Sequence, residues 1–358
     1  MTMKKLIYSL IIPFLIFSCK KQGCTNPTAV NYNQHAEQDD GSCEYEIIEN
    51  SLPIIIDSDL TLTNDKIWYL VNRTSITNGA TLTIEPGTII KGEAGTGPNA
   101  TALIIARGSK INAQGTENQP IIFTSAADNI QIGERVGSSL DNTINGLWGG
   151  LVVLGNAPIS AASPSMQIEG IPPSDPSGLY GGESPEDNSG VLKYISIRHG
   201  GANIGEGNEL NGLTLGGVGS STTIENIEVV ANQDDGIECF GGTVNIKNAL
   251  VWGVGDDCLD IDQGYSGTID NSLIIPLPFT DHVLEIDGGE GIWNANFSIT
   301  NCESISEISQ AHFRAEASGY ISLFGNFNIE ADPGTNVQVD SLSIGADYSK
   351  FNWTYYFN

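Results

Sequence analysis

The chain has few basic residues. Its 358 residues include 15 Lys and Arg against 43 Asp and Glu, which gives a formal net charge of −28. A protein that binds nucleic acid needs a basic face to neutralise phosphates, so this balance argues against a nucleic-acid partner. Histidine is scarce as well, with four copies. We recognise no Ser-His-Asp order, no Cys and His spacing of a zinc site and no phosphate-binding loop. The acidity suits divalent cations or a surface exposed to the medium.

Long apolar runs are absent except at the start of the chain. Two lysines precede the mostly apolar stretch Leu6–Phe17, which is too short to span a bilayer as a stable helix. Cys19 follows shortly after it. The segment resembles a bacterial lipoprotein signal, in which residues 1–18 are removed and Cys19 becomes the lipidated first residue. We therefore expect an outer membrane lipoprotein that meets the membrane only through its N-terminal lipid. The sequence leaves open whether it faces the periplasm or the medium.

Cysteine is also rare, and two of the six copies lie close together in a small segment, Gly23–Tyr45. This segment resembles a short module of secreted proteins of Bacteroidetes, which begins with Gly-Cys-Thr and ends with Asp-Asp-Gly-Ser-Cys. A segment this small cannot close a core without a staple. We therefore predict a disulfide between Cys24 and Cys43. Residues 19–50 would then hold the lipidated cysteine, a tether and the disulfide-stapled module.

Helical periodicity is missing from about residue 61 onward, and short apolar runs instead alternate with Gly, Asn and Asp turns. One short phrase occurs four times, beginning at Asn211, Asp235, Asp257 and His282, with steps of 24, 22 and 25 residues. A repeat of this length is one coil of a β-solenoid. A second ladder repeats Ile-x-Asn from residues 224, 246, 269 and 299, which suits an interior Ile and a left-handed Asn turn.

These repeats predict an all-β fold, a right-handed parallel β-helix over residues 51–302. A segment near 156–190 is rich in Pro, Ser, Asp and Gly and reads as a loop excursion from the coils. Residues 303–358 are expected to form a C-terminal β region that could cap the open end, because exposed sheet edges need covering.

Strand alternation then assigns side-chain directions. Two columns are expected to point inward: Leu213, Ile237, Leu259 and Leu284, and beside them Leu215, Cys239, Ile261 and Ile286. The column between them points outward and becomes acidic along the chain: Thr214, Glu238, Asp260 and Glu285. Like charges at the strand spacing of about 4.8 Å repel by about 3–4 kcal/mol at an effective dielectric near 20. Compensation is therefore expected from a bound cation, a raised pKa or turn hydrogen bonds.

Three interpretations of the acidic columns stay open. The carboxylates could be solvated turn residues without a ligand. They could form a Ca²⁺ ladder, since oxygen ligands without His or Cys favour a hard cation. The expected calcium ligands are Glu238, Asp260, Asp262, Glu285 and Asp287. The third interpretation is the carboxylate pair of a carbohydrate-cleaving enzyme.

Several motifs in order carry a resemblance to a known family. They include Ile84-Glu-Pro-Gly-Thr-Ile-Ile-Lys-Gly92, Leu147-Trp-Gly-Gly-Leu151 and Phe240-Gly-Gly-Thr243. Together they resemble a family of secreted or lipid-anchored β-helix proteins of Bacteroidetes. The resemblance implies the fold and a place in the cell envelope, and it carries over no catalytic residues.

A narrower resemblance concerns Gly255-Asp-Asp-Cys-Leu-Asp-Ile261, which is similar to the Asp-Asp-Cys motif of polygalacturonases. It implies Asp235, Asp256, Asp257 and His282 as catalytic candidates on successive coils. Inverting glycosidases need one carboxyl to protonate the leaving oxygen and one to activate water. The family's Gly-His-Gly and Arg-x-Lys motifs are absent, and only Arg314 remains near the second.

The expected function is therefore a binding or structural role in the cell envelope, with a glycan or other extracellular polymer as partner and Ca²⁺ ordering the acidic face. The alternative is a polysaccharide-degrading enzyme, a polygalacturonase-like hydrolase acting on an acidic polysaccharide. Any of the five tryptophans could stack on a sugar ring, and Trp252 is the preferred platform because it lies just before the Asp256-Asp257 turn.

Overall fold

The structure is a computed structural model that describes residues 20–25, 29–38, 40–43, 48–204, 210–293 and 295–357. The chain divides into two compact units, one ending at Glu49 and the other beginning at Asn50. Within the described residues, no helix is long and apolar enough to cross a bilayer. Cys19 and the signal segment lie outside the described residues.

The first unit is held by one covalent bond. Cys24 and Cys43 form a disulfide with their Cα atoms 4.7 Å apart, which confirms the predicted pair. The Asn33 amide donates to the Cys24 carbonyl at 2.9 Å, and Gln22 pairs with Gln38 in an isolated bridge. Among the described residues of this unit, Cys24 and Ala29 are the buried apolar ones, so the disulfide supplies much of the closure there.

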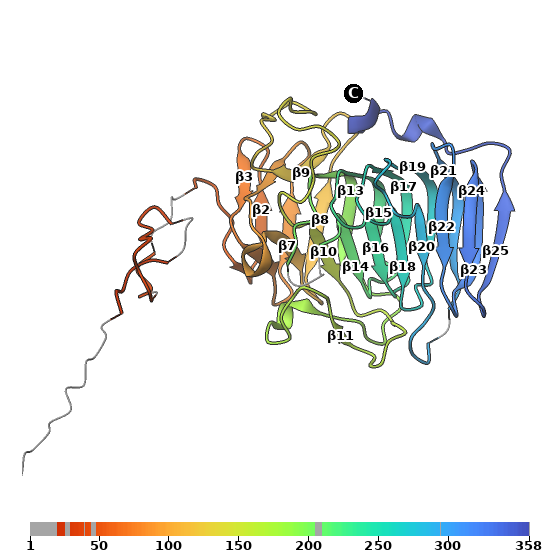
Figure 1. Ribbon diagram of the computed structural model, residues 1–358, viewed down its shortest axis with the longest axis horizontal. Coiled ribbons are helices and arrows are strands. Elements are labelled where there is room, and N and C mark those ends of the chain that lie inside the picture. Colours follow the sequence, from red (N-terminus) through yellow and green to blue (C-terminus); the bar gives the residue numbers. More distant parts are fainter. Residues whose placement is uncertain are drawn as a thin grey trace, which may run out of the picture. The chain divides into compact units, whose positions relative to one another are not determined.

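The second unit is a spiral of parallel strands (Figure 1). A ten-stranded sheet contains, in order, β1 (Ile55–Ile56), β4 (Arg73–Ile76), β7 (Ala102–Ile105), β10 (Leu151–Leu154), β14 (Leu213–Gly216), β16 (Ile237–Phe240), β18 (Leu259–Asp262), β20 (Leu284–Ile286), β22 (Ser309–Phe313) and β24 (Phe327–Ala331). A thirteen-stranded sheet contains β2 (Leu60–Leu62), β5 (Thr81–Ile84), β8 (Lys110–Gln114), β13 (Gly190–Arg198), β15 (Thr223–Val230), β17 (Asn245–Trp252), β19 (Thr268–Ile275), β21 (Phe297–Ser304), β23 (Ser318–Phe324) and β25 (Asn336–Ser341), with β3 (Ile67–Leu70), β6 (Ile89–Gly92) and β9 (Ile121–Ser125) beside them.

The long strands of the second sheet bend in the middle, which creates a third face. Asn226, Asn248, Asn271 and Asn301 adopt positive φ at the bend. The side-chain amide of Asn248 donates to Asn226 Oδ1 at 3.0 Å, and that of Asn271 donates to Asn248 Oδ1 at 2.8 Å. Asparagine tolerates the left-handed region, and its amide can bridge successive coils. The predicted Ile-x-Asn ladder is therefore a real column.

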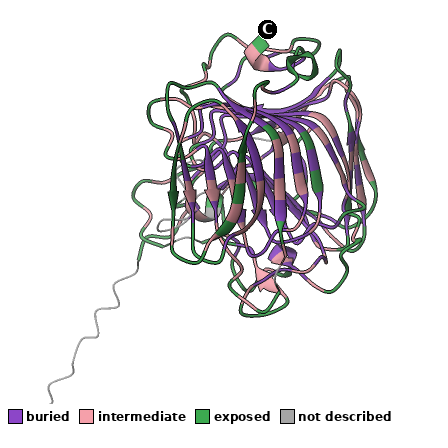
Figure 2. Ribbon diagram, turned by 90° about the vertical axis from the view of Figure 1, so that its right-hand side faces the viewer, coloured by how far each residue is buried: buried purple, intermediate pink, exposed green. Residues whose placement is uncertain are grey.

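The interior is filled by the two inward columns that alternation predicts. The first column consists of Leu213, Ile237, Leu259 and Leu284, which pair in register and are fully buried. The column that contains Cys239 is in register and buried as well. Cys239 and Cys258 are free, buried thiols. Figure 2 shows the buried residues concentrated along the strands that enclose this interior. The predicted all-β fold, a right-handed parallel β-helix with a disulfide-stapled N-terminal module, is confirmed.

Segments leave the coils at several points, and two of them cover the outer sides of the sheets. The first lies between β10 and β13 and covers the predicted excursion near 156–190, with β11 (Met166–Gln167), η2 (Pro176–Gly178) and β12 (Leu179–Tyr180). It packs against apolar side chains that point outward from β7 and β10, including Ile104, Val152 and Leu154. This excursion therefore covers part of the ten-stranded sheet.

The second segment is the C-terminus, and here the structure differs from the expected boundary at residue 302. β22–β25 continue both ladders, so the coils extend to Ser341. Only the residues after β25 leave the coils, with η3 (Tyr348–Lys350) and η4 (Tyr355–Phe357). Phe351 packs against Leu250 and Leu273 on the outer side of β17 and β19. This segment covers a side of the β-helix rather than its end.

Candidate functional site: an acidic face on the ten-stranded sheet

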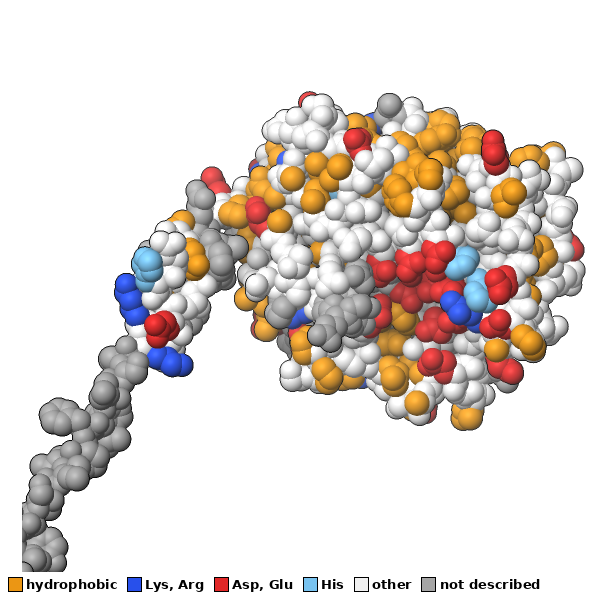
Figure 3. All heavy atoms as spheres, in the orientation of Figure 1, with side chains coloured by type: hydrophobic (Ala, Val, Ile, Leu, Met, Phe, Trp, Pro, Cys, Tyr) orange, Lys and Arg blue, Asp and Glu red, His pale blue; other side chains and the backbone are white. Residues whose placement is uncertain are grey.

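The outward column of the ten-stranded sheet places like charges side by side. Register pairs Thr214 with Glu238, Glu238 with Asp260, Asp260 with Glu285, and Glu285 with His312. In Figure 3 the acidic side chains form one patch, bordered on one side by two histidines and a basic residue. The stacking predicted for Glu238, Asp260 and Glu285 is thus confirmed by the strand pairing.

A second column arises from the turn that precedes each strand. Asp257 donates its amide to Asp235 Oδ1 at 2.9 Å, and His282 donates its amide to Asp257 Oδ1 at 2.8 Å. The His282 ring contacts the same carboxyl, with Nδ1 2.9 Å from Asp257 Oδ1. Asn211 occupies the equivalent position at the start of the first repeat copy. Turn hydrogen bonds therefore compensate part of the repulsion, as the sequence led us to expect.

Three carboxylates of these columns form a compact inner cluster. Asp235, Glu238 and Asp260 each offer an oxygen within 4.8 Å of the others. Asp235 and Glu238 are 7% and 6% exposed. The Asn211 side-chain amide donates to Glu238. No Lys or Arg forms an ion pair with any of these three carboxylates among the described residues.

The electrostatics of the inner cluster favour neutral carboxyls. Burial, followed by repulsion from Asp260, raises the pKa of Asp235 and of Glu238 well above its ordinary range. Burial, followed by repulsion from Asp262 and Glu285, does the same to the pKa of Asp260. In addition, Asp260 Oδ1 and Asn211 Oδ1 are buried and accept no hydrogen bond from any described residue. The cluster therefore contains oxygen acceptors that a proton or a cation would satisfy.

The negative charges of two other predicted calcium ligands, Glu285 and Asp287, are compensated by an arginine. Arg314 Nε donates to Glu285 Oε1 at 2.8 Å and lies 3.6 Å from Asp287 Oδ1. Glu285 and Asp287 therefore already face a cation supplied by the chain, although the guanidinium is partly exposed and its pairing is correspondingly weak. The five predicted ligands thus fall into three groups: Glu238 and Asp260, without an ion pair to Lys or Arg among the described residues, Glu285 and Asp287, which Arg314 contacts, and Asp262.

Asp262 lies at the border with the excursion. Its strand neighbour Phe240 packs against Tyr180, with ring centroids 6.0 Å apart, and Tyr180 donates to Gln263 Oε1 at 2.9 Å. Burial raises the pKa of Asp262 to about 7. The excursion therefore forms one wall beside the acidic face and leaves the outward side of β18 and β20 open.

The four residues suggested by the polygalacturonase resemblance also come together. One group joins Asp235 and Asp256 with Asp234, and a second joins Asp257 and His282 with Glu285, each with ligand atoms within 4.8 Å. Burial, with repulsion from Glu285 and Asp256, raises the pKa of Asp257 to about 9. A catalytic role for this constellation stays a prediction.

Trp252 does not lie on this face. It belongs to β17 in the other sheet, where its ring contacts Tyr355 at 5.7 Å and Tyr356 at 5.0 Å between centroids. The C-terminal segment therefore covers one side of the Trp252 ring. This placement does not support the predicted sugar platform.

Sequence reasoning missed two contributors to the face, His312 and the pairing of Arg314. It placed Asn211 at the start of the first repeat copy but did not assign it to the acidic face. His312 and Arg314 lie on β22 and just after it, where the repeated phrase is no longer recognisable. His312 lies beside His282, with ring centroids 5.8 Å apart.

Comparison with known proteins places the chain by its fold. A family model described as a pectate-lyase-like β-helix domain matches residues 54–323. No curated protein and no solved structure matches the chain.

Proposed function

Because the chain belongs to the family of pectate-lyase-like β-helix domains, we propose that it is a binding protein of the cell envelope. In this proposal the acidic face holds Ca²⁺ and presents it, with the neighbouring turns, to a glycan or another extracellular polymer. The protein would be anchored in the outer membrane through a lipid on Cys19. Mass spectrometry of the mature N-terminal peptide tests the anchor, and an unmodified Cys19 would contradict it.

The observation that carries the calcium part is the inner cluster of Asp235, Glu238 and Asp260, in which two carboxylates are buried, one is half-buried, and none is ion-paired with a Lys or Arg among the described residues. The atoms that could coordinate a cation are carboxylate oxygens and the nearby amide oxygen of Asn211. Hard cations such as Ca²⁺ take six to eight oxygen ligands from this kind of set, completed by water. A bound cation would oppose both causes of the three raised pKa values, burial first and then repulsion between the carboxylates.

The surroundings of the candidate catalytic pair bear on which polymer the face could bind. Asp257 and His282 bond to each other through Oδ1 and Nδ1, at 2.9 Å. Arg314 is the basic residue of this face, and it is paired with Glu285 and Asp287. An acidic polysaccharide would therefore meet uncompensated carboxylates unless Ca²⁺ bridged the two. Neutral polymers, or calcium-bridged acidic ones, suit the face better.

Calorimetric titration with CaCl₂ tests the cation directly. Wild type should bind Ca²⁺, and Glu238→Gln should bind it at least tenfold more weakly, because one inner ligand loses its charge. Glu330→Gln is the matched control: Glu330 stands in the same outward column at its exposed end, on β24, and should leave the titration unchanged. Equal binding by wild type and Glu238→Gln would contradict the proposed site.

A glycan array in calcium and in EDTA then tests the partner. The enzyme alternative is separated from binding by replacing Asp256 and Asp257 together with Asn. A hydrolase should lose reducing-sugar release from polygalacturonate while it stays folded, whereas a binding protein should show no release in either form. Release by wild type that the double variant abolishes would replace the binding proposal with the enzymatic one.

A further inference from the structure

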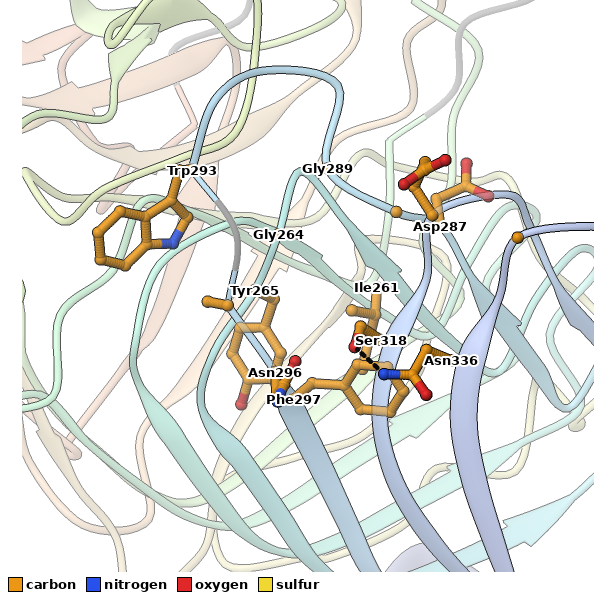
Figure 4. Close-up of a pocket in the computed structure, with 14 residues that line it drawn as sticks. Ile261, Gly264, Tyr265, Asp287, Gly289, Trp293, Asn296, Phe297, Ser318 and Asn336 are labelled. Carbon is orange, nitrogen blue, oxygen red and sulfur yellow. Dashed lines mark hydrogen bonds between the residues drawn. The ribbon is translucent and has the colours of Figure 1, made fainter.

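A pocket of about 460 Å³ opens where the chain turns after β18, β20, β22 and β24 (Figure 4). Its size lies within the range of about 300–1,000 Å³ that is typical of small-molecule sites. It is distinct from the inner cluster, since Asp235, Glu238 and Asp260 do not line it, and it touches the acidic face only at Asp287. Neither the predicted calcium ligands of the inner cluster nor the Asp257-His282 pair accounts for it.

Aromatic side chains form its wall and floor. Trp293 stands on the turn between β20 and β21 with 36% of its surface exposed, while Tyr265 and Phe297 are buried beneath. Figure 4 shows the Trp293 ring on one side of the pocket and Phe297 on the other, with Tyr265 between them. The Tyr265 hydroxyl donates to the Val244 carbonyl at 2.7 Å, so that ring is fixed. An exposed indole beside buried rings offers an apolar platform to the flat face of a sugar.

The turn that carries Trp293 is held in place by the excursion. Ser160 donates its amide to the Gln263 carbonyl at 2.7 Å and accepts from the Glu290 amide at 2.9 Å. Its hydroxyl oxygen accepts from the Gly291 amide at 3.0 Å. Gly264 lies under this turn, where an added Cβ would stand 2.9 Å from the Ser160 side chain and 3.4 Å from the Trp293 ring. The Trp293 wall is therefore set before any ligand arrives, which lowers the entropic cost of binding.

The remaining lining side chains suit hydroxyl groups and reject anions. Asn296, Ser318 and Asn336 provide amide and hydroxyl groups, and Asn336 donates to Ser318 Oγ at 3.3 Å. Asp287 and Glu316 add carboxylates, which accept hydrogen bonds from hydroxyls. No Lys, Arg or His is found among the described residues that line the pocket. An anionic group would meet the carboxylates of Asp287 and Glu316, and the nearby Arg314 is already engaged by Glu285 and Asp287.

We propose that this pocket binds one unit of a neutral saccharide, stacked on Trp293 and hydrogen-bonded by Asn296, Asn336 and the two carboxylates. The proposal deepens the proposed binding function by naming the sugar class, an uncharged one. It does not need Ca²⁺, because the pocket lies outside the inner cluster. The calcium proposal for the acidic face and the saccharide proposal for the pocket can therefore be tested separately.

The test is titration of the full mature chain with neutral hexasaccharides (cellohexaose, xylohexaose, mannohexaose and laminarihexaose) and with hexagalacturonate, each in EDTA and in CaCl₂. At least one neutral oligomer should bind equally in both buffers, and hexagalacturonate should not bind in EDTA. Trp293→Ala should weaken the neutral oligomer at least tenfold. Ile292→Ala is the matched control, because Ile292 is the adjacent residue, fully exposed and outside the pocket lining.

Three results would overturn the proposal: no neutral oligomer binds, only hexagalacturonate binds, or Trp293→Ala and Ile292→Ala affect binding equally. Circular dichroism of Trp293→Ala confirms that the variant is folded, and Trp293→Phe should retain part of the affinity through its smaller ring. Glu238→Gln separates the two sites. It should weaken calcium binding at least tenfold and leave the affinity for the neutral oligomer unchanged, so weaker calcium binding alone does not count against the saccharide pocket.

Discussion

Replacing Asp260 with Asn tests the physical basis of the acidic face most directly. Asp260 lies between Glu238 and Glu285 in the outward column, and its pKa is raised by burial and by neighbouring carboxyls. A carboxyl with a raised pKa in the folded state contributes most stability below its unfolded pKa and loses that contribution as the pH rises through the folded value. We therefore expect the calcium-free wild type to lose stability as the pH rises above about 4, the pKa of an unfolded Asp, and Asp260→Asn to lose less.

The size of the effect follows from strand spacing. Adjacent strands lie about 4.8 Å apart, where two unit charges repel by about 3.5 kcal/mol at an effective dielectric near 20. The wild type protonates some of its carboxyls rather than carry every charge, so relief of a single pair is expected. In EDTA at pH 9, Asp260→Asn should exceed the wild type by about 3 kcal/mol in free energy of unfolding. That corresponds to a Tm higher by about 6 °C. At pH 5 the two proteins should differ little.

Thermal melts at pH 5, 7 and 9, in EDTA and in CaCl₂, measure this. Calcium should raise the Tm of the wild type most at pH 9, where the carboxylates are ionised, and should raise that of Asp260→Asn less. Glu330→Gln controls for a change of net charge at an exposed end of the same column. A variant that is destabilised equally at every pH and in both buffers would refute the reasoning, because Asp260 would then act only as a hydrogen-bond acceptor.

Three further outcomes are expected. In urea unfolding, Asp257→Asn should gain stability on wild type as the pH rises from about 4, the pKa of an unfolded Asp, to about 9, the folded pKa of Asp257, and the difference should stay constant at higher pH; a large loss at pH 7 would show that the ionised carboxyl holds His282. Replacing Cys24 and Cys43 with Ser should remove about 2–4 kcal/mol from the first unit only, so limited proteolysis should cleave that unit while the melt of the β-helix stays unchanged. Trp353→Ala should lower the free energy of unfolding by about 3–5 kcal/mol, because the side chain is 2% exposed, and unfolding close to that of wild type would mean that the C-terminal segment adds little.

Register was the part of the fold that could be predicted best, because a coil repeats its own spacing. Once Leu213, Ile237 and Leu259 were aligned, alternation placed every neighbouring side chain inward or outward. The Asn ladder followed for the same reason, since one residue type meets one backbone conformation at each bend. The outward acidic column is a direct consequence of that alignment.

The contacts that the sequence did not predict involve segments that do not belong to the repeat. Trp252 was expected to face a ligand, and nothing in its own strand shows that Tyr355 and Tyr356 cover it from the end of the chain. The pairing of Arg314 with Glu285 joins residues whose coils no longer share a recognisable phrase. Non-repeating segments choose their contacts by tertiary packing, which local pattern does not encode.

The acidic face is difficult to explain as a requirement of the fold. Coil stacking is stabilised by the inward columns and by the Asn ladder, so an outward position tolerates many side chains. The same column carries apolar Ile104 and Val152 where the excursion covers it, and neutral Thr214 one coil before Glu238. It becomes acidic only beyond that cover, where stacked charges cost stability. A costly feature restricted to the uncovered coils is what a binding surface requires, and this contrast within one column favours a ligand there over a purely structural role.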